Sequence, residues 1–432
     1  MPAETREIAV DYLARVEGEG AMYLKLDGET VKDLRFNIFE PPRFYEAFLR
    51  GRRFGEAPDI TARICGICPV AYQTSAVNAM EFAAAVTVDP AIRQLRRLLY
   101  FGEWIESHTL HVYMLHAPDF LGYPSAIEMA GDHPDVVTNA LRLKKLGNTI
   151  MTVVGGREIH PINTRVGGFY RAPTKRELED LLPELYWARD TARATVDFVA
   201  GLEFPDFSMD YEFVALRHPT EYAIVDGRVA STAGIDIDVA EWRDHFEELH
   251  VEWSNALHAR IKERGRYHVG PMARFTINHD RLTPLASEAA AAVGLERGES
   301  NPFKSIVVRA VEIVLSCEEA IGIIETYHRP DPPFVDVDPA GSVGHGASEA
   351  PRGLLYHRYE IDAEGLIADA QIVPPTSQNQ AQIEEDLREY LVGRTHLDDD
   401  TLQWQLEQAI RNYDPCISCA THFLDLTVDR SP

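Results

Sequence analysis

Four of the five cysteines in this chain form two Cys-x-x-Cys pairs at opposite ends of the sequence. The first pair is Cys65 and Cys68, in the segment RICGICP, and the second is Cys416 and Cys419, in DPCISCATH. Two thiols three positions apart can point at one metal ion, and two such pairs supply four thiolates, a soft ligand set suited to nickel, zinc or iron–sulfur units. The fold must therefore bring the two ends of a long chain together to build one metal site.

Spacing by itself leaves the metal open. Zinc ribbons also use paired Cys-x-x-Cys, but usually with about 15–20 residues between the pairs, whereas nearly the whole chain separates these two. The cysteines of a simple iron–sulfur cluster usually lie in one stretch. A structural zinc site and a redox-active metal both remain open at this point. The fifth cysteine, Cys317, lies in an apolar stretch and is interpreted as a small buried hydrophobe.

Length and composition exclude several classes of protein. The chain has 432 residues, 45% hydrophobic and 25% charged, enough for one large domain or two smaller ones. No run of about 18 apolar residues predicts a transmembrane helix, and residues 1–7 are too acidic and polar for a secretory signal. A net charge of −26 argues against nucleic acid or an anionic membrane as partner. We therefore expect an intracellular protein that uses its thiols for metal or redox chemistry.

The elements that must position the cysteine pairs can be predicted from periodicity and turn residues. Hairpins are predicted over residues 21–39, over 212–230 with its turn at Asp226-Gly227, and over 355–373. Residues 341–346 are predicted as loop. Helices are predicted over residues 71–86, 90–116, 135–154, 174–201, 305–327, 380–391 and 400–412. This order predicts an α+β fold, a large single domain with a central bundle of long helices flanked by small antiparallel sheets.

The residues around both pairs resemble the large, catalytic subunit of nickel–iron hydrogenases. The two cysteine motifs are the specific signals, and weaker ones follow in the family's order at residues 15–18, 107–119, 155–161, 350–353 and 373–379. The resemblance spans most of the chain and implies that family's fold for a single domain over 1–432. Such subunits are commonly cut after the histidine equivalent to His422. Residues 423–432 are therefore expected to be either a C-terminal extension that is removed during maturation or a tail that this form of the protein keeps.

By that resemblance, the four thiolates bind nickel. Cys65 and Cys416 are expected as terminal nickel ligands, while Cys68 and Cys419 bridge nickel to an iron atom that carries carbon monoxide and cyanide. Soft thiolates and strong-field diatomic ligands favour electron-rich metals able to bind hydrogen. A zinc site would give no reason for the residues that surround each pair.

Hydrogen cleavage also needs a base for the proton. The resemblance makes Cys416 the candidate base and Glu17 the glutamate that carries the proton away. Taken alone, Glu17 is typical of a surface glutamate in a glycine-rich stretch, and Glu19 stands where the family usually has histidine. The role of Glu17 therefore depends on the resemblance and on the position of Glu17 in the fold.

Further side chains are expected around the metals. Arg352 matches an arginine that lies over them, and a guanidinium is a fixed cation with rigid donors that can hydrogen-bond a cyanide. Asp119 and Asp414 match polar residues around the site, although an Asp-Pro pair also commonly starts a turn. The residues expected to line the cyanides are Pro351, Pro375 and Thr376.

A second metal ion is implied near the C-terminus. The family binds a hard cation there through a glutamate, a backbone carbonyl and a histidine, which match Glu46, Ile372 and His422. Oxygen ligands and water suit magnesium.

The implied activity is the reversible oxidation of hydrogen to protons and electrons. Only Cys317 is left for an electron-transfer cluster, so we expect a small subunit that carries iron–sulfur clusters. The chain most resembles the cytoplasmic, NAD(P)-linked group that includes the sulfhydrogenases, and it has no Gly-x-Gly-x-x-Gly fingerprint, so NAD(P) or flavin is expected on diaphorase-type partner subunits. A maturation protease is a further expected partner. The alternatives are a non-catalytic subunit like that of respiratory complex I and a zinc-stabilised protein.

Overall fold

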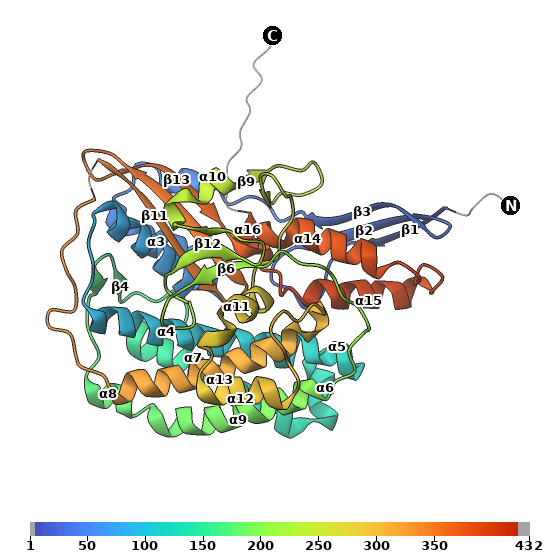
Figure 1. Cartoon of the computed structure of the whole chain (residues 1–432), viewed down its shortest axis with the longest axis horizontal. Coiled ribbons are helices and arrows are strands. Elements are labelled where there is room, and N and C mark those ends of the chain that lie inside the picture. The colour runs from blue at the N-terminus through green and yellow to red at the C-terminus, as the bar shows by residue number, and fades with distance from the viewer. Residues whose placement is uncertain (1–4, 340, 422–432) are drawn as a thin grey trace, which may run out of the picture.

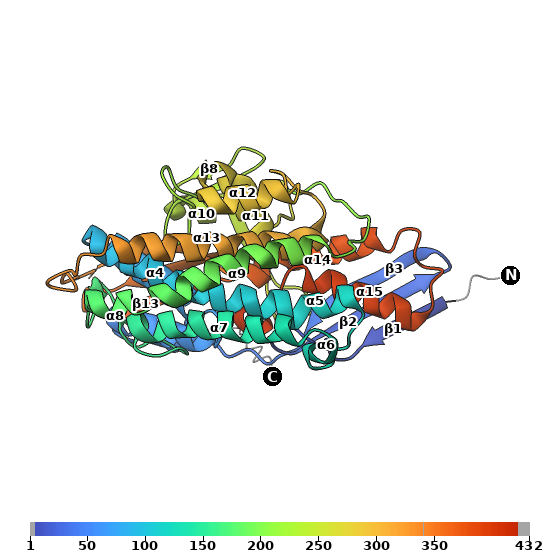
Figure 2. The same cartoon turned by 90° about the horizontal axis from the view of Figure 1, so that it is seen from below.

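The computed structural model describes residues 5–339 and 341–421. Four long helices form a bundle along one side of the molecule, and the figures show them side by side: α4 (Pro90–Thr109), α7 (Pro134–Gly155), α9 (Leu182–Ala200) and α13 (Ser305–Glu325) (Figures 1 and 2). Helix α4 packs against α7 and α13, and α13 packs against α9. Because α13 is apolar on nearly all sides, it is buried along most of its length. The predicted helical bundle is confirmed.

An N-terminal antiparallel sheet lies at one end of the molecule, in the order β1 (Thr5–Val10), β2 (Gly20–Asp27) and β3 (Thr30–Ile38). Alternate side chains of β2 are buried, as expected for a sheet with one covered face. That face shares a hydrophobic core with α14 (Pro375–Tyr390) and α15 (Asp399–Arg411). The predicted hairpin is confirmed, and β1 is an additional strand that the sequence pattern did not indicate.

A second sheet consists of β11 (Ser342–Ala350), β12 (Gly353–Ile361) and β13 (Ile367–Val373) and packs on α3 (Pro69–Ala83). The prediction of a loop at residues 341–346 is wrong, because most of this segment is β11. Glycine usually indicates a turn, but Gly344 and Gly346 lie within a strand. A Cβ atom at either position would collide with backbone of α3, so these glycines let the strand approach the helix closely.

Two other predictions of local structure are also wrong. Strands β6 (Val214–Arg217) and β7 (Arg228–Ser231) pair as predicted, but residues 218–227 connect them as a long loop instead of a tight turn. Arg93 binds Asp226 through two hydrogen bonds of 2.9 and 2.7 Å and fixes this loop. The helix predicted over 174–201 is divided into α8 (Lys175–Glu179) and α9, because Pro183 cannot continue a helix from the preceding turn.

The remaining elements are short. The strands are β4 (Thr164–Arg165), β5 (Gly168–Phe169), β8 (Asp236–Ile237), β9 (Phe246–Leu249) and β10 (His258–Ile261). The helices are α1 (Tyr45–Leu49), α2 (Ala57–Thr61), α5 (Ala117–Leu121), α6 (Ala126–Asp132), α10 (Trp242–His245), α11 (Pro271–Asn278), α12 (Pro284–Ala292) and α16 (Ile417–Ala420). Within the described ranges, no helix is both long and apolar enough to span a membrane.

The helix predicted over 90–116 changes character at its end. After α4, residues 110–116 form a π-helical turn, a feature that is frequent at functional sites. The turn carries His111, whose ring Nε2 lies 2.8 Å from the backbone carbonyl of Arg411. Because Arg411 ends the helix before the second cysteine pair, the π-turn supports that part of the chain.

Helices α4 and α7 cross at two glycines, and the fold should be sensitive to this contact. A Cβ atom at Gly147 would lie 2.5 Å from the carbonyl oxygen of Gly102 and 2.7 Å from the amide nitrogen of Glu106. We expect Gly147→Ala to lower the free energy of unfolding by about 1–3 kcal/mol through overpacking. The matched control is Gly131→Ala, because Gly131 is exposed in α6 and a Cβ atom there would have no neighbouring atom within 4 Å. Thermal unfolding followed by circular dichroism should rank Gly131→Ala at or above the parent; equal midpoints for both variants would contradict the prediction.

Candidate metal centre

The first cysteine pair lies between a single turn of 3₁₀ helix at residues 62–64 and helix α3. The backbone amides of Ile67 and Cys68 each lie 3.3 Å from the sulfur of Cys65 and donate to it. Cys68 precedes the first turn of α3, and the buried carboxylate of Glu103 accepts hydrogen bonds from the amides of Val70, at 2.6 Å, and Ala71, at 3.2 Å. Glu103 thereby anchors the start of the helix and with it the position of the Cys68 thiol.

The second cysteine pair follows α15. The chain passes through Asp414, which adopts a left-handed conformation with φ of 50°, then Pro415, and reaches Cys416 and α16. Such a conformation is uncommon for a residue other than glycine and is typical of functional sites. The amide of Ile417 donates to the carbonyl of Glu17 at 2.9 Å, so the N-terminal segment lies directly alongside this turn.

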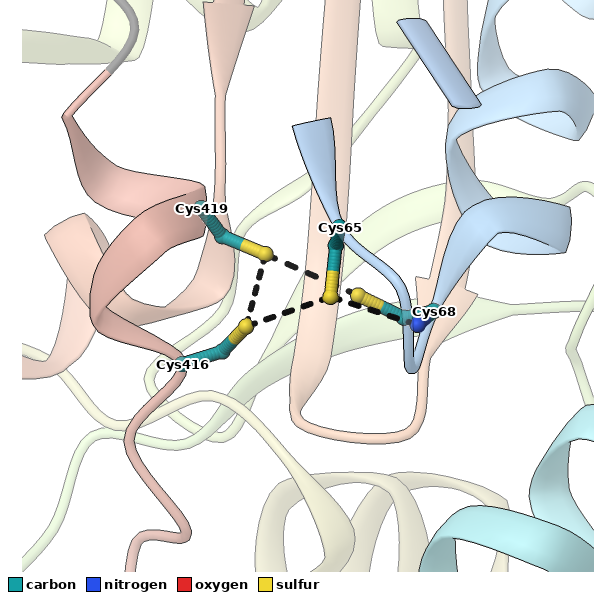
Figure 3. Close-up of side chains that lie close together, drawn as sticks. All are labelled: Cys65, Cys68, Cys416 and Cys419. Carbon is teal, nitrogen blue, oxygen red and sulfur yellow. Dashed lines mark hydrogen bonds between the residues drawn. The ribbon is translucent and has the colours of Figure 1, made fainter. Parts of the chain in front are cut away.

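The two pairs meet in the interior of the protein, as the sequence predicted (Figure 3). The sulfur of Cys65 lies 3.4 Å from that of Cys416, and the sulfur of Cys68 lies 3.6 Å from that of Cys419. The sulfurs of Cys416 and Cys419 are 2.8 Å apart, and all four lie within 4.8 Å of one another. Each cysteine is at most 3% exposed. Four soft ligands enclosed in this way fit nickel with a bridged iron.

The four thiols do not ionise equally. Hydrogen bonds from Cys416, Cys419 and Cys68 hold the pKa of Cys65 well below its usual range. Burial raises the pKa of Cys416 and of Cys419. Since several thiolates in an apolar interior repel one another, the complete set of four needs positive charge close by.

Arg352 supplies part of that charge. Its Nε donates to the carbonyl of Asp414 at 2.6 Å, and its Nη2 donates to the carboxylate of Asp414 at 3.0 Å. Burial opposes the charge, but Asp414 and the thiolates of Cys416, Cys68 and Cys65 raise the pKa of Arg352 well above its usual range. Its buried Nη1 has no hydrogen-bond partner among the described residues. An unused buried donor beside the thiols fits an acceptor that belongs to the metal centre, such as a cyanide nitrogen.

Glu17 lies next to Cys416, as the resemblance implied. The Cys416 thiol donates to Glu17 Oε2 over 3.1 Å, and the amide of Ser418 donates to the same oxygen over 3.0 Å. Burial raises the pKa of Glu17, and the nearby thiolate of Cys65 raises it further. A carboxyl group with a raised pKa and a direct contact to a thiol is well suited to exchange a proton with that thiol.

The three residues expected beside the cyanides are all buried. Thr376 lies in the first turn of α14, and its hydroxyl oxygen accepts a hydrogen bond from the amide of Cys416 at 3.0 Å. Pro375 opens the same helix. The carbonyl of Pro351 accepts from Arg274 Nη2 at 2.9 Å, which holds the turn that carries Arg352. Arg274 is itself fixed by Glu312 through two hydrogen bonds of 2.8 Å.

Asp119 occupies a different position from the other expected residues. Both of its carboxylate oxygens accept hydrogen bonds from Arg411, at 2.7 and 2.9 Å, and Arg15 pairs with the same carboxylate. Arg15 belongs to the segment that carries Glu17, and Arg411 to the helix that leads to Cys416. Asp119 therefore ties together the two backbones that bring this glutamate and this cysteine into contact.

Two of the three residues expected to bind magnesium lie together. Glu46, in α1, accepts a hydrogen bond from the amide of Ile372, in β13, at 2.7 Å. Burial raises the pKa of Glu46 well above its usual range, and the nearby carboxylate of Glu248 adds to the effect. A cation between these groups would favour the charged form of Glu46. His422 lies outside the described residues.

Sequence reasoning missed a residue that joins the two cysteine motifs. Arg43 Nη2 donates to the carbonyl of Ile64 at 2.7 Å, just before the first pair, and also to the carbonyl of Ser418 within the second. The amide of Arg43 donates to the carbonyl of Thr421 at 2.7 Å. All three contacts are to backbone oxygens, which carry no signature in the sequence.

Tyr72 was also missed, although its spacing offered a signal. It lies one helical turn after Cys68 on α3, where side chains four apart share a face. The residue is 1% exposed, and its hydroxyl has no hydrogen-bond partner among the described residues. Burial raises the pKa of Tyr72 well above its usual range, and the thiolates of Cys419, Cys68 and Cys416 raise it further. The Tyr72 hydroxyl is thus an available donor near the metal site.

A second group of potential metal ligands, His218, Glu221 and Asp226, has no need of a metal. Arg93 binds both carboxylates, with its Nη2 at 2.5 Å from Glu221 and 2.7 Å from Asp226. A guanidinium already supplies the positive charge there.

Known proteins resemble this chain over almost its full length. The family model described as nickel-dependent hydrogenase matches residues 43–138 and 267–422, which include all four clustered cysteines. Sulfhydrogenase 1 subunit alpha of Pyrococcus furiosus is 34% identical over 426 residues, covering 97% of this chain and 98% of that protein. The NAD-reducing hydrogenase HoxS subunit beta of Cupriavidus necator is 30% identical, covering 97% of this chain and 95% of that protein.

Solved structures agree with this assignment. The crystal structure of an NAD+-reducing [NiFe]-hydrogenase in the H2-reduced state has a TM-score of 0.86 and 27% identity, covering 97% of this chain and 100% of that one. The predicted α+β fold with its helical bundle is confirmed by this similarity. Together with the four buried, converging thiols, the match shows that this chain belongs to the nickel-dependent hydrogenase family, as a large subunit.

Proposed function

We propose that this chain is the catalytic subunit of a hydrogenase that reversibly oxidises hydrogen to protons and electrons. The observation that carries the proposal is the convergence of four buried thiols, one of which, Cys416, donates a hydrogen bond to the carboxylate of Glu17 at 3.1 Å. A structural zinc site would need the thiols alone. A carboxylate on one thiol and an unused guanidinium donor are features of a centre that moves protons and binds further ligands.

The four cysteines would hold the metals, with Cys65 and Cys416 on nickel and Cys68 and Cys419 shared between nickel and iron. When bound, nickel and iron supply the soft, electron-rich pair at which hydrogen is split. Cys416 then acts as the base that receives the proton, and Glu17 takes it over at 3.1 Å. Burial raises the pKa of Glu17, which favours the uptake of a proton by its carboxyl group.

The surrounding residues would fix the iron and its diatomic ligands. Arg352 directs its free Nη1 to a cyanide, and Asp414 keeps the guanidinium in place through two hydrogen bonds. Pro351, Pro375 and Thr376 would line the remaining ligand positions. Asp119 would contribute from a distance, by holding the backbones that carry Glu17 and Cys416.

A magnesium ion would occupy the second site, bound by the carboxylate of Glu46, the carbonyl of Ile372 and His422. Its support is the pair of partly buried carboxylates, Glu46 and Glu248, whose mutual repulsion a cation would relieve.

Electrons must leave through a partner. Cys317 is buried in α13, and burial raises the pKa of its thiol to about 12, so it cannot serve as a cluster ligand by itself. We propose that an iron–sulfur small subunit docks over the first cysteine motif. Two exposed apolar side chains adjoin residues that contact the start of that motif, with Phe44 43% exposed and Ile159 52% exposed. The residue after each of them contacts the chain at the start of the motif. The hydroxyl of Tyr45 donates to the carbonyl of Arg63, and the ring Nδ1 of His160 lies within hydrogen-bond distance of the carbonyl of Ala62.

The remaining features of the complex are proposed from the similar proteins. The similarity to an NAD-reducing hydrogenase supports an NAD(P)-linked enzyme. This enzyme would act in the cytoplasm, with NAD(P) and flavin on diaphorase-type subunits. The chain would form one domain over residues 1–432, and a maturation protease would remove residues 423–432 after nickel insertion.

Metal analysis and infrared spectroscopy of the purified complex test the proposal. We expect nickel and iron in the complex, together with infrared bands from carbon monoxide and cyanide bound to iron. Zinc as the sole metal, with no such bands, would show that the site is structural and would refute the hydrogenase function.

A further inference from the structure

The residue before Asp414 is anchored to α14. The hydroxyl of Tyr413 donates to Oδ2 of Asp386 at 2.6 Å, and the hydroxyl of Tyr211 donates to the same oxygen at 2.6 Å. The side-chain amide of Gln382 donates to Oδ1 at 2.8 Å. Asp386 is 3% exposed, and all three donor side chains are buried as well. Tyrosines from two distant segments of the chain therefore converge on one buried carboxylate of α14.

The protonation of these groups fits strong hydrogen bonds. Burial raises the pKa of Tyr211 and of Tyr413 well above the usual range, and the charge of Asp386 adds to the rise, so each hydroxyl keeps its proton. Burial also raises the pKa of Asp386, to about 6, although the hydrogen bonds from the tyrosines oppose the rise. Above that pH Asp386 is mainly a carboxylate, and hydrogen bonds to an ionised acceptor are the stronger ones.

The turn that follows Tyr413 is strained and leads directly to the cysteine pair. Asp414 has φ of 50°, a conformation that persists only when the surrounding contacts enforce it. After the turn, the hydroxyl oxygen of Thr376 accepts the amide of Cys416 at 3.0 Å. Thr376 and Asp386 both belong to α14, so this one helix holds the chain before and after the strained residue.

We propose that Asp386 is a positioning residue of the metal centre, which acts through the hydroxyl of Tyr413. The inference rests on the proposed hydrogenase function. Arg352 donates to the carbonyl of Asp414 at 2.6 Å and to its carboxylate at 3.0 Å. The guanidinium therefore moves with the turn, and so does its unused donor Nη1. Loss of the anchor displaces the donor proposed for a cyanide and loosens the segment that ends at Cys416.

Tyr211 offers a matched control. It donates to the same oxygen of Asp386 over the same distance, but it lies in the loop before β6 and borders a surface cavity. The ring of His268 packs against both tyrosines, with its centroid 4.8 Å from that of Tyr211 and 4.7 Å from that of Tyr413. Phenylalanine at either position keeps this packing and removes only the hydroxyl. The two substitutions therefore remove equivalent hydrogen bonds, and only one of these belongs to the segment that leads to Cys416.

The experiment compares Tyr413→Phe, Tyr211→Phe and Asp386→Ala in the assembled holoenzyme. It measures nickel content, thermal unfolding, the infrared bands of carbon monoxide and cyanide, and hydrogen–deuterium exchange of the backbone amides within residues 412–417. We expect Tyr413→Phe to keep its nickel, to shift the cyanide bands, and to exchange these amides at least about tenfold faster, because a hydrogen bond to a charged group is lost. Asp386→Ala should produce the same changes. Tyr211→Phe should lower the unfolding midpoint as much as Tyr413→Phe does, with parental bands and parental exchange within residues 412–417.

The outcomes separate the anchor from the underlying function. Parental bands and parental exchange in Tyr413→Phe would overturn the role of Asp386 and leave the hydrogenase proposal intact. Equal changes in Tyr413→Phe and Tyr211→Phe would show that the effect does not pass through Tyr413, and would also overturn it. The two tyrosine variants decide the question even where Asp386→Ala fails to fold. A parent without carbon monoxide and cyanide bands would refute the hydrogenase proposal, whereas faster exchange in Tyr413→Phe alone would still show that Asp386 holds the turn.

Discussion

A Cys416→Ala variant should lose its nickel and retain less than about one thousandth of the parental rate of hydrogen oxidation. Cys416 is expected both to bind nickel and to receive the proton. Its sulfur lies 3.4 Å from the sulfur of Cys65 and 3.1 Å from the carboxylate of Glu17. Its removal would take away one proposed terminal nickel ligand and the proposed base that receives the proton. Nickel per polypeptide by mass spectrometry and hydrogen uptake with an artificial electron acceptor measure the two losses separately.

The control for this prediction is Cys317→Ala. Cys317 is as buried as Cys416, but it lies in α13, and burial raises the pKa of its thiol to about 12. The substitution should leave nickel content and activity at the parental level, and cost only about 1 kcal/mol of stability for the lost packing. Nickel retained in Cys416→Ala, or lost equally in Cys317→Ala, would contradict the assignment of the clustered thiols as ligands.

The sequence predicted the convergence of the four cysteines correctly because the signal of the two pairs is chemical and local. Two Cys-x-x-Cys pairs can supply four ligands to one metal ion, so their convergence could be predicted from the ligand set itself. The bundle was also predictable, since α4 and α13 have long helical patterns. Glu17 could be assigned only through the resemblance, because nothing in a glycine-rich segment distinguishes a buried glutamate from an exposed one.

The features that could not be predicted depend on contacts between distant backbones. Arg43 binds carbonyl oxygens near both cysteine pairs, and carbonyl oxygens are the same at every position of the chain. Strand β11 was hidden because Gly344 and Gly346 are used for close packing on α3 instead of for a turn. The hydrogen bond from the amide of Ser418 to the carboxylate of Glu17 joins two distant segments of the chain, so it became visible only in the folded structure.

A Glu17→Gln variant should keep its metals and lose proton transfer. Glutamine has nearly the same shape as glutamate, and its carbonyl oxygen can still accept the hydrogen bonds from Cys416 and from the amide of Ser418. It cannot take up a proton at ordinary pH. We therefore expect hydrogen oxidation and the exchange of H2 with D2O to fall by at least about a hundredfold, which is the range for loss of a positioned acid–base group.

The same variant separates a proton carrier from a structural residue. Nickel content and the infrared bands of carbon monoxide and cyanide should match the parent, because none of the expected metal ligands is altered. A structural role for Glu17 would instead show as lost nickel or shifted bands, since the carbonyl of Glu17 also holds the amide of Ile417 beside Cys416. Full activity in Glu17→Gln would remove Glu17 from the proton path.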